Sequence, residues 1–130
     1  MTTLQYNVIN REENAMNNKV VGENIRKLRE QAGFTQSCLA QFMHVDQSLV
    51  SKIESGDRNL SVNMLEKLAT LFGVTAEHLE TKGDAIIPEV SIAFRGSDLS
   101  AEEMEAIAAV NRIALNAVFM DNLLKGGKND

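Results

Sequence analysis

Four polar side chains in the middle of the chain share one face at helical spacing: Gln47, Ser48, Ser51 and Lys52. Each is of moderate length and forms hydrogen bonds, which suits contact with base edges and phosphates in the major groove of DNA. A purely structural helix could carry the same residues on a solvated face. The chemistry of this face therefore depends on the elements that position it.

The segment 35–56 is typical of two short helices joined by a tight turn, the first ending near Met43 and the second beginning just after Asp46. Their shared inward face is apolar and consists of Leu39, Ala40, Met43, Val45, Val50 and Ile53. Helices this short need neighbours to bury such a face, and amphipathic segments stand directly before and after them. We therefore expect a compact domain of about five helices over residues 19–83.

The same region carries a recognisable order of motifs: Thr35-Gln36, Leu39-Ala40, the serine-rich 48–51, Ile53-Glu54-Ser55-Gly56, Gly73-Val74 and Leu79. In this order the chain resembles the Cro/C1-type helix-turn-helix family, the XRE class, over about 64 of its 130 residues. The resemblance implies an all-α fold with a five-helix, lambda-repressor-like DNA-binding domain. It also implies a sequence-specific transcriptional regulator whose partner is double-stranded DNA.

The resemblance gives roles to particular residues of the motif. Gln47 would be the leading base reader, because a glutamine can make a bidentate contact with adenine, and Lys52 would reach guanine or a phosphate. Ser48 and Ser51 would touch either a base or the backbone. Gln36 would meet a phosphate or base beside the recognition helix, where the amides at the start of its own helix add partial positive charge.

Two further pairs match family positions. Arg29 and Glu54 match a structural ion pair between the first and third helices. Arg58 and Asn59 match a loop that usually holds a DNA phosphate, although a solvated turn would have the same composition. We therefore expect Arg29 and Glu54 to stabilise the domain, and Arg58 and Asn59 to bind DNA.

Two residues depart from the family pattern. His44 stands at the turn position that normally holds glycine, where positive φ is required, and histidine is among the residue types that tolerate it. Cys38 stands where the family often has an acidic residue, so Thr35 lacks the partner that would complete a capping box. We expect Thr35 to cap its helix alone.

Composition indicates one globular domain with an extension, because the 130 residues are 44% hydrophobic and include one proline and one cysteine. No apolar run approaches the length of a membrane span, and the first 18 residues lack the features of a signal peptide. The sequence therefore predicts a cytoplasmic protein that does not associate with a membrane. Residues 1–18 are polar and rich in asparagine, and we expect a flexible leader before a first helix near Lys19.

The net charge of −5 does not exclude nucleic-acid binding, because the charge is unevenly distributed along the chain. Residues 19–83 carry eight basic and eight acidic side chains, whereas residues 84–130 carry four basic and eight acidic ones. We expect a neutral DNA-binding domain to have weak non-specific affinity for DNA, so useful binding would need two such domains acting together.

Residues 84–130 offer a means of pairing two chains. Val90, Ile92 and Phe94 alternate with smaller residues after Pro88, which is typical of a short strand or extended arm. Such an arm would pack along its own domain or pair with the same arm of a second subunit.

A long helix is predicted after this arm. Ser100 and Glu103 form a capping box, and Gly126-Gly127 ends the helix after about 25 residues. One apolar stripe along it comprises Ala106, Val110, Ile113, Ala117, Met120 and Leu124. A second comprises Met104, Ile107, Ala108, Leu115, Val118, Phe119 and Leu123. Two apolar faces need two partners, so we expect one on the DNA-binding domain and the other on a second copy, giving a homodimer. The alternative is that the helix only completes the core.

The sequence contains no pattern typical of catalysis. The two histidines and the single cysteine have no ligand set at metal spacing and no base partner, and no phosphate-binding loop or nucleophile elbow is present. We therefore expect a protein that is not an enzyme and has no metal or cofactor.

The functional prediction is a homodimeric repressor of an inverted-repeat operator. The alternative is an antitoxin or regulator whose acidic, apolar C-terminal part binds a partner protein, either a toxin or a peptidase. A small inducer bound between the arm and the final helix is a third hypothesis.

Overall fold

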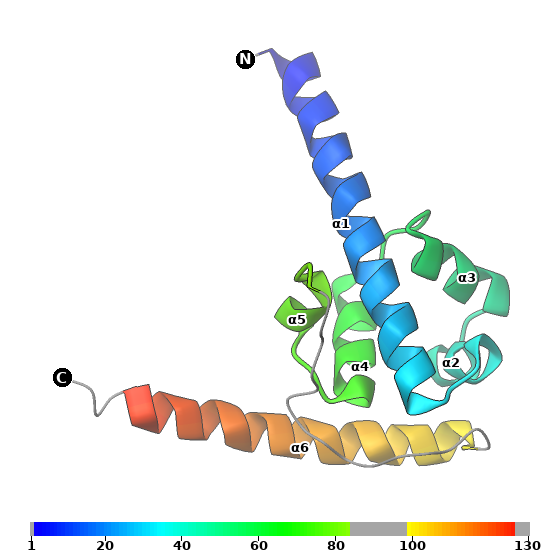
Figure 1. Cartoon of the computed structure of the whole chain (residues 1–130), viewed down its shortest axis with the longest axis vertical. Coiled ribbons are helices and arrows are strands. Elements are labelled where there is room, and N and C mark those ends of the chain that lie inside the picture. The colour runs from blue at the N-terminus through cyan, green and yellow to red at the C-terminus, as the bar shows by residue number, and fades with distance from the viewer. Residues whose placement is uncertain (1, 84–98, 127–130) are drawn as a thin grey trace.

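The computed structural model describes residues 2–83 and 99–126, and within these ranges it contains six helices and no strand (Figure 1). The helices are α1 (Thr3–Ala32), α2 (Gln36–Met43), α3 (Gln47–Ser55), α4 (Val62–Phe72), α5 (Ala76–Glu80) and α6 (Ala101–Gly126). Helices α1 to α5 pack around one core and are called the headpiece below. This confirms the predicted all-α fold of five helices followed by a long C-terminal helix.

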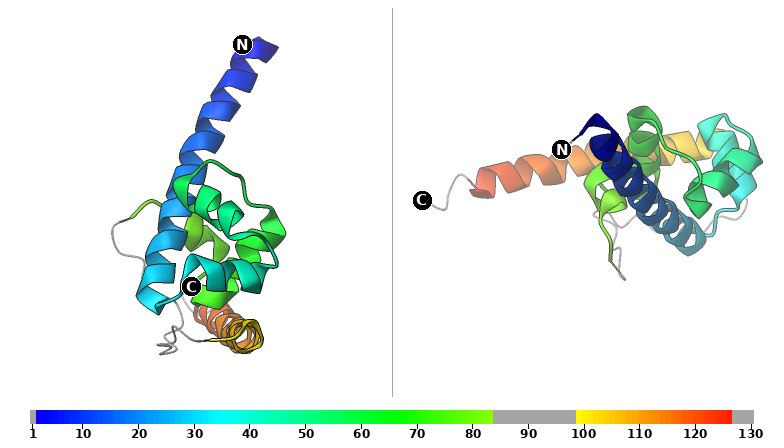
Figure 2. Two further views of the ribbon diagram at one scale, coloured as in Figure 1. Left: turned by 90° about the vertical axis from the view of Figure 1, so that its right-hand side faces the viewer. Right: turned by 90° about the horizontal axis from the view of Figure 1, so that it is seen from above.

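Helix α1 begins sixteen residues earlier than the sequence analysis predicts. It starts at Thr3 rather than near Lys19, and a capping box between Thr2 and Gln5 closes its N-terminus. No proline or glycine precedes Gly22, so nothing in the sequence interrupts helical hydrogen bonding over this stretch. The first half of α1 projects from the headpiece, while its second half packs against α3, α4 and α5 (Figure 2).

The headpiece core unites side chains from all five helices. The fully buried ones include Ile25, Leu39, Phe42, Val50, Leu68 and Leu79. Asn24 connects α1 to the end of α5 by hydrogen bonds, because its Nδ2 donates to the carbonyl oxygens of Leu79 and Thr81 at 2.8 and 2.9 Å. The core therefore fixes α1 relative to α5 by both apolar contact and directed hydrogen bonds.

The turn between α2 and α3 adopts the predicted geometry. His44 has φ 58° and ψ 45°, a left-handed conformation that ends α2. Thr35 caps the start of α2 alone, through a 3.0 Å hydrogen bond from the Cys38 backbone N–H to its side-chain oxygen. The six predicted inward residues are buried, except that Val45 is only half-buried.

Helix α6 lies across one end of the headpiece, against α4 and α2, and its second half extends beyond them (Figure 1). Ser100 and Glu103 form the predicted capping box. Its packed half buries Met104, Ile107 and Ala108, which belong to one predicted stripe. Asn111 secures the contact, since its Nδ2 donates to the carbonyl oxygens of Thr70 and Leu71 at the end of α4, at 2.8 and 3.1 Å.

The extended half of α6 is largely solvent-exposed. Large apolar side chains of α6 that are more than half exposed are Val110 in its first half and Ile113, Phe119, Met120, Leu123 and Leu124 further along. Contrary to the expectation from sequence, α6 is long and apolar enough to cross a membrane by length and composition alone. Core helices of soluble proteins pass the same test. The arm predicted around Val90, Ile92 and Phe94 lies outside the described residues.

Candidate nucleic-acid interface

Helix α3 separates its polar and apolar residues onto opposite faces. The buried face holds Val50, Ile53 and Glu54. The exposed face holds the four polar residues predicted to bind DNA, which are Gln47, Ser48, Ser51 and Lys52. Because α3 is held by its buried side alone, the exposed side is available along its whole length to enter a groove.

Helix α1 approaches the end of α3 so closely that only glycine fits between them. A Cβ atom on Gly22 would lie 2.2 Å from the carbonyl oxygen of Ile53, which is well inside contact distance. Gly56 then ends α3 with φ 85°, and a Cβ there would lie 2.8 Å from the Lys19 Cγ. These two glycines set the position of α3 against α1.

A buried cluster of charged and polar groups links α1, α2 and α3. Arg29 binds Glu54 through two hydrogen bonds, from Nε to Oε2 at 2.6 Å and from Nη2 to Oε1 at 3.0 Å. Arg29 also donates to the carbonyl oxygen of Phe34 at 2.9 Å. The hydrogen bonds that Arg29 donates to Glu54 raise the pKa of Arg29 above its ordinary value, so the guanidinium stays charged. The pair matches the structural role that the resemblance implies.

Gln36, predicted to contact DNA, takes part in this cluster. Its side-chain Nε2 donates to Glu54 Oε1 at 3.1 Å, and the residue is half-exposed at the first turn of α2. The hydrogen bond to Glu54 uses one N–H of the amide, so a second N–H and the side-chain oxygen remain for another partner.

The loop after α3 places Arg58 and Asn59 in the open. Both are exposed, and together with Asn17 and Asn18 of α1 they line a small cleft of about 100 Å³. The loop and α1 are 40 residues apart in sequence, so only the folded structure brings these side chains together.

Two basic residues beside α3 were not predicted as part of the interface. Lys19 and Arg26 of α1 line a shallow groove of about 400 Å³ with Glu23 of the same helix and with Ser51, Glu54 and Ser55 of α3. Both cations are exposed, and the described residues show no ion pair for either. Their spacing of seven residues places them on one face of α1, which is the signal in the sequence that could have identified them.

The residues predicted to form a dimer fall into two groups. Val90, Ile92 and Phe94 lie outside the described residues. The others lie on the exposed side of α6, namely Val110, Ile113, Ala117, Met120 and Leu124.

Metal-ligand chemistry is not apparent in the described part of the chain. Across residues 2–83 and 99–126, no three His, Cys, Asp or Glu side chains gather as metal ligands would. Cys38 is half-buried and not in a disulfide. The predicted lack of a cofactor and of catalysis stays a prediction.

Comparison with known proteins yields one family and several relatives. The family described as helix-turn-helix matches residues 25–79, which include α2, α3 and α4. The chain is 35% identical to the HTH-type transcriptional regulator RamB of Mycobacterium tuberculosis over 69 residues. These residues make up 53% of this chain and 15% of RamB. The chain is 33% identical over 73 residues to the competence pilus inhibition repressor of Acinetobacter baylyi, covering 51% of this chain and 66% of the relative.

A third relative is the HTH-type transcriptional regulator PrpR of Mycobacterium tuberculosis. The identity is 30% over 74 residues, which cover 56% of this chain and 15% of PrpR. The chain thus spans a small part of RamB and PrpR and just under two thirds of the competence repressor. No solved structure matches the chain.

Proposed function

Because this chain belongs to the Cro/C1-type (XRE) family of helix-turn-helix DNA-binding transcription regulators, we propose that it is a homodimeric repressor that binds an inverted-repeat operator. The observation that carries the proposal is the exposed polar face of α3, whose opposite face is locked to α1. A rigid helix with a free polar face is what major-groove recognition requires.

On this proposal the interface divides into base contacts and backbone contacts. Gln47 and Lys52 discriminate between bases, while Ser48 and Ser51 contact bases or sugar–phosphate. Arg58 and Asn59 bind backbone phosphates in the loop after α3. Lys19 and Arg26 of α1 bind further phosphates, since they line the groove beside Ser51.

Pairing of two headpieces supplies affinity that one neutral headpiece lacks. The exposed apolar side of α6 supports this part of the proposal, because a stripe of that size on a protruding helix is stabilised by burial against another surface. Two recognition helices related by a twofold axis would enter successive major grooves about 34 Å apart. Such a dimer, bound over a promoter, would repress transcription by excluding RNA polymerase. This activity would take place in the cytoplasm.

The name of one relative supports repression rather than activation in this proposal. That relative is named a competence pilus inhibition repressor, and it is also the relative of which this chain covers the largest share. That name describes the relative, and for this chain repression remains part of the proposal.

The test is a DNase I protection assay on the DNA upstream of this protein's own gene, at a stated salt concentration. We expect the wild type to protect an inverted repeat and a Gln47→Ala/Lys52→Ala variant to lose protection. Loss of two base contacts costs about 2–6 kcal/mol. A Gln31→Ala/Lys125→Ala variant is the matched control, since both residues are exposed and neither lines the grooves beside α3.

Each outcome of the assay has a definite meaning. Protection that survives in the Gln47→Ala/Lys52→Ala variant would contradict recognition through α3. Absence of specific protection by the wild type would favour the alternative role, in which the exposed side of α6 binds a partner protein. In that role the chain would still be a helix-turn-helix protein, and only the partner of its C-terminal part would differ.

A further inference from the structure

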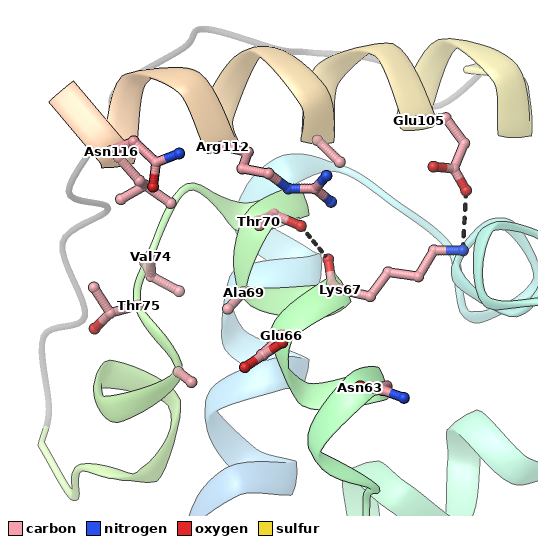
Figure 3. A pocket seen from close by; sticks show the side chains of 13 residues that line it. Asn63, Glu66, Lys67, Ala69, Thr70, Val74, Thr75, Glu105, Arg112 and Asn116 are labelled. Carbon is pink, nitrogen blue, oxygen red and sulfur yellow. Dashed lines mark hydrogen bonds and ion pairs between the residues drawn. The ribbon is translucent and has the colours of Figure 1, made fainter.

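An open groove of about 670 Å³ runs between α4 and α6, at the start of α5, away from the DNA-binding residues (Figure 3). Its volume is in the range of small-molecule sites. Buried side chains at its base are apolar and small, namely Ala69, Val74 and Ala108. Polar side chains from both helices surround this base, so the groove joins an apolar surface to groups that can orient a ligand.

Two of the four charged side chains in the groove neutralise one another. Lys67 Nζ lies 2.9 Å from Glu105 Oε1, and it also lies 4.6 Å from the centre of the Phe42 ring. Figure 3 shows this ion pair connecting α4 to α6. Lys67 and Glu105 are therefore already paired with each other, and together they present little net charge to a ligand in the groove.

The other two charged side chains, Glu66 and Arg112, have opposite signs and come from different walls. Glu66 belongs to α4 and Arg112 to α6, and both are exposed. Within residues 2–83 and 99–126 neither forms an ion pair. The groove thus presents one unpaired cation and one unpaired anion above an apolar base.

We propose that this groove binds a small zwitterion of the amino-acid class. Arg112 binds the carboxylate, since the forked donors of a guanidinium match its two oxygens. Glu66 accepts hydrogen bonds from the ammonium group, and the apolar side chain of the ligand rests on Ala69, Val74 and Ala108. A simple anion fits less well, because its charge would lie near the carboxylates of Glu66 and Glu105.

Occupancy would join α4 to α6, because the two charged contacts come from different helices. A ligand bound only by the folded chain raises the unfolding temperature as its concentration rises. The site does not depend on DNA binding or on dimerisation, so it can be tested separately from the proposed function.

The experiment is a titration of the full chain, followed by the amide signals in heteronuclear NMR spectra. The common amino acids are each added to about 10 mM at constant pH and ionic strength. We expect at least one to cause saturable shifts at the amides of Ala69, Ala108 and Arg112. Its N-acetyl form lacks the ammonium and its amide form lacks the carboxylate, and each should bind at least about tenfold more weakly.

Variants identify the contacts. Arg112→Gln and Glu66→Gln should each weaken binding about tenfold, and circular dichroism should show unchanged helix content, because both side chains are exposed. Lys125→Gln is the matched control, a cation on the same helix that pairs with Asp121 outside the groove. The proposal is overturned by saturable binding that both variants retain, by equal binding of the N-acetyl form, or by the absence of saturable shifts with every amino acid.

Discussion

The headpiece and α6 are held in the fold by different kinds of contact. In the headpiece, a core drawn from five helices and completed by Met104, Ile107 and Ala108 of α6 is reinforced by directed polar bonds, such as those of Arg29 with Glu54 and of Asn24 with the end of α5. Helix α6 is attached along its first half only, and its second half carries large apolar side chains in the open. The headpiece is thus complete within one chain, whereas α6 is incomplete. Substitutions in the two regions should therefore have different consequences.

Removing the carboxylate of Glu54 should give the largest effect on stability. Glu54→Ala leaves Arg29 without its partner at a position where its side chain is only 12% exposed, and a guanidinium remains charged at neutral pH without any partner. An unpaired buried charge of this kind costs about 3–5 kcal/mol. Urea denaturation should show this loss in the free energy of unfolding. Glu30→Ala is the control, because Glu30 is an exposed carboxylate near the same arginine, and an equal loss there would contradict the assignment.

Adding one methyl group at Gly22 should give the next largest effect. In Gly22→Ala the new Cβ meets the backbone of α3, which has to move away from α1, and such overpacking costs about 1–3 kcal/mol. Thermal unfolding measures this change. Gly83→Ala provides the comparison, because nothing lies within 4 Å of a Cβ placed there. Equal unfolding temperatures for the two variants would show that the close approach of α1 to α3 is not needed.

Weakening the attachment of α6 should have a smaller and more local effect. Asn111→Ala removes two hydrogen bonds to the end of α4 but also removes a buried side-chain oxygen that has no partner. The net cost is about 1 kcal/mol. Hydrogen exchange should accelerate in α6 and remain unchanged in α1 and α3. Asn122→Ala on the exposed half is the control, and acceleration throughout the headpiece would mean that the attachment of α6 stabilises the whole domain rather than α6 alone.

Substitution on the exposed side of α6 should change stability least and assembly most. Ile113→Ser/Met120→Ser removes two exposed apolar side chains, and the unfolding free energy of the monomer should change by less than about 0.5 kcal/mol. Light scattering coupled to gel filtration should show a dimer for the wild type and a monomer for the variant. Val62→Ser, at a residue that is 70% exposed in the headpiece, should leave the dimer intact.

The same measurement distinguishes the occupants of this surface. A wild type that is monomeric at all concentrations would count against the homodimer. Co-sedimentation with lipid vesicles, lost in the Ile113→Ser/Met120→Ser variant, would instead assign the surface to a membrane, consistent with the apolar character of α6.

Local chemistry was sufficient to predict several helix ends. The turn at His44, the start of α3 after Asp46 and the capping box at Ser100 all depend on residues within a few positions of one another. The predicted start of α1 was wrong because residues 3–18 show no apolar periodicity, and without it the sequence gives no sign of a helix that buries one face. Such a segment is helical through continuity with the packed part of α1.

The candidate interface was predictable only where it is continuous in sequence. The exposed face of α3 follows from helical periodicity and the motif alone. Lys19 and Arg26 were missed because they reach Ser51 through the packing of α1 on α3, a contact across at least 25 residues. The inward hydrogen bond of Gln36 likewise requires knowledge of where Glu54 lies.

The hydrogen bond from Gln36 to Glu54 also bears on how affinity for DNA would be divided between enthalpy and entropy. A free glutamine side chain loses rotamer freedom when it meets its target, and this loss weakens association. Gln36 is already restrained by a carboxylate that Arg29 itself holds in place. The ordering of this side chain thus accompanies folding of the headpiece, and its contact with a duplex would form without that entropic cost.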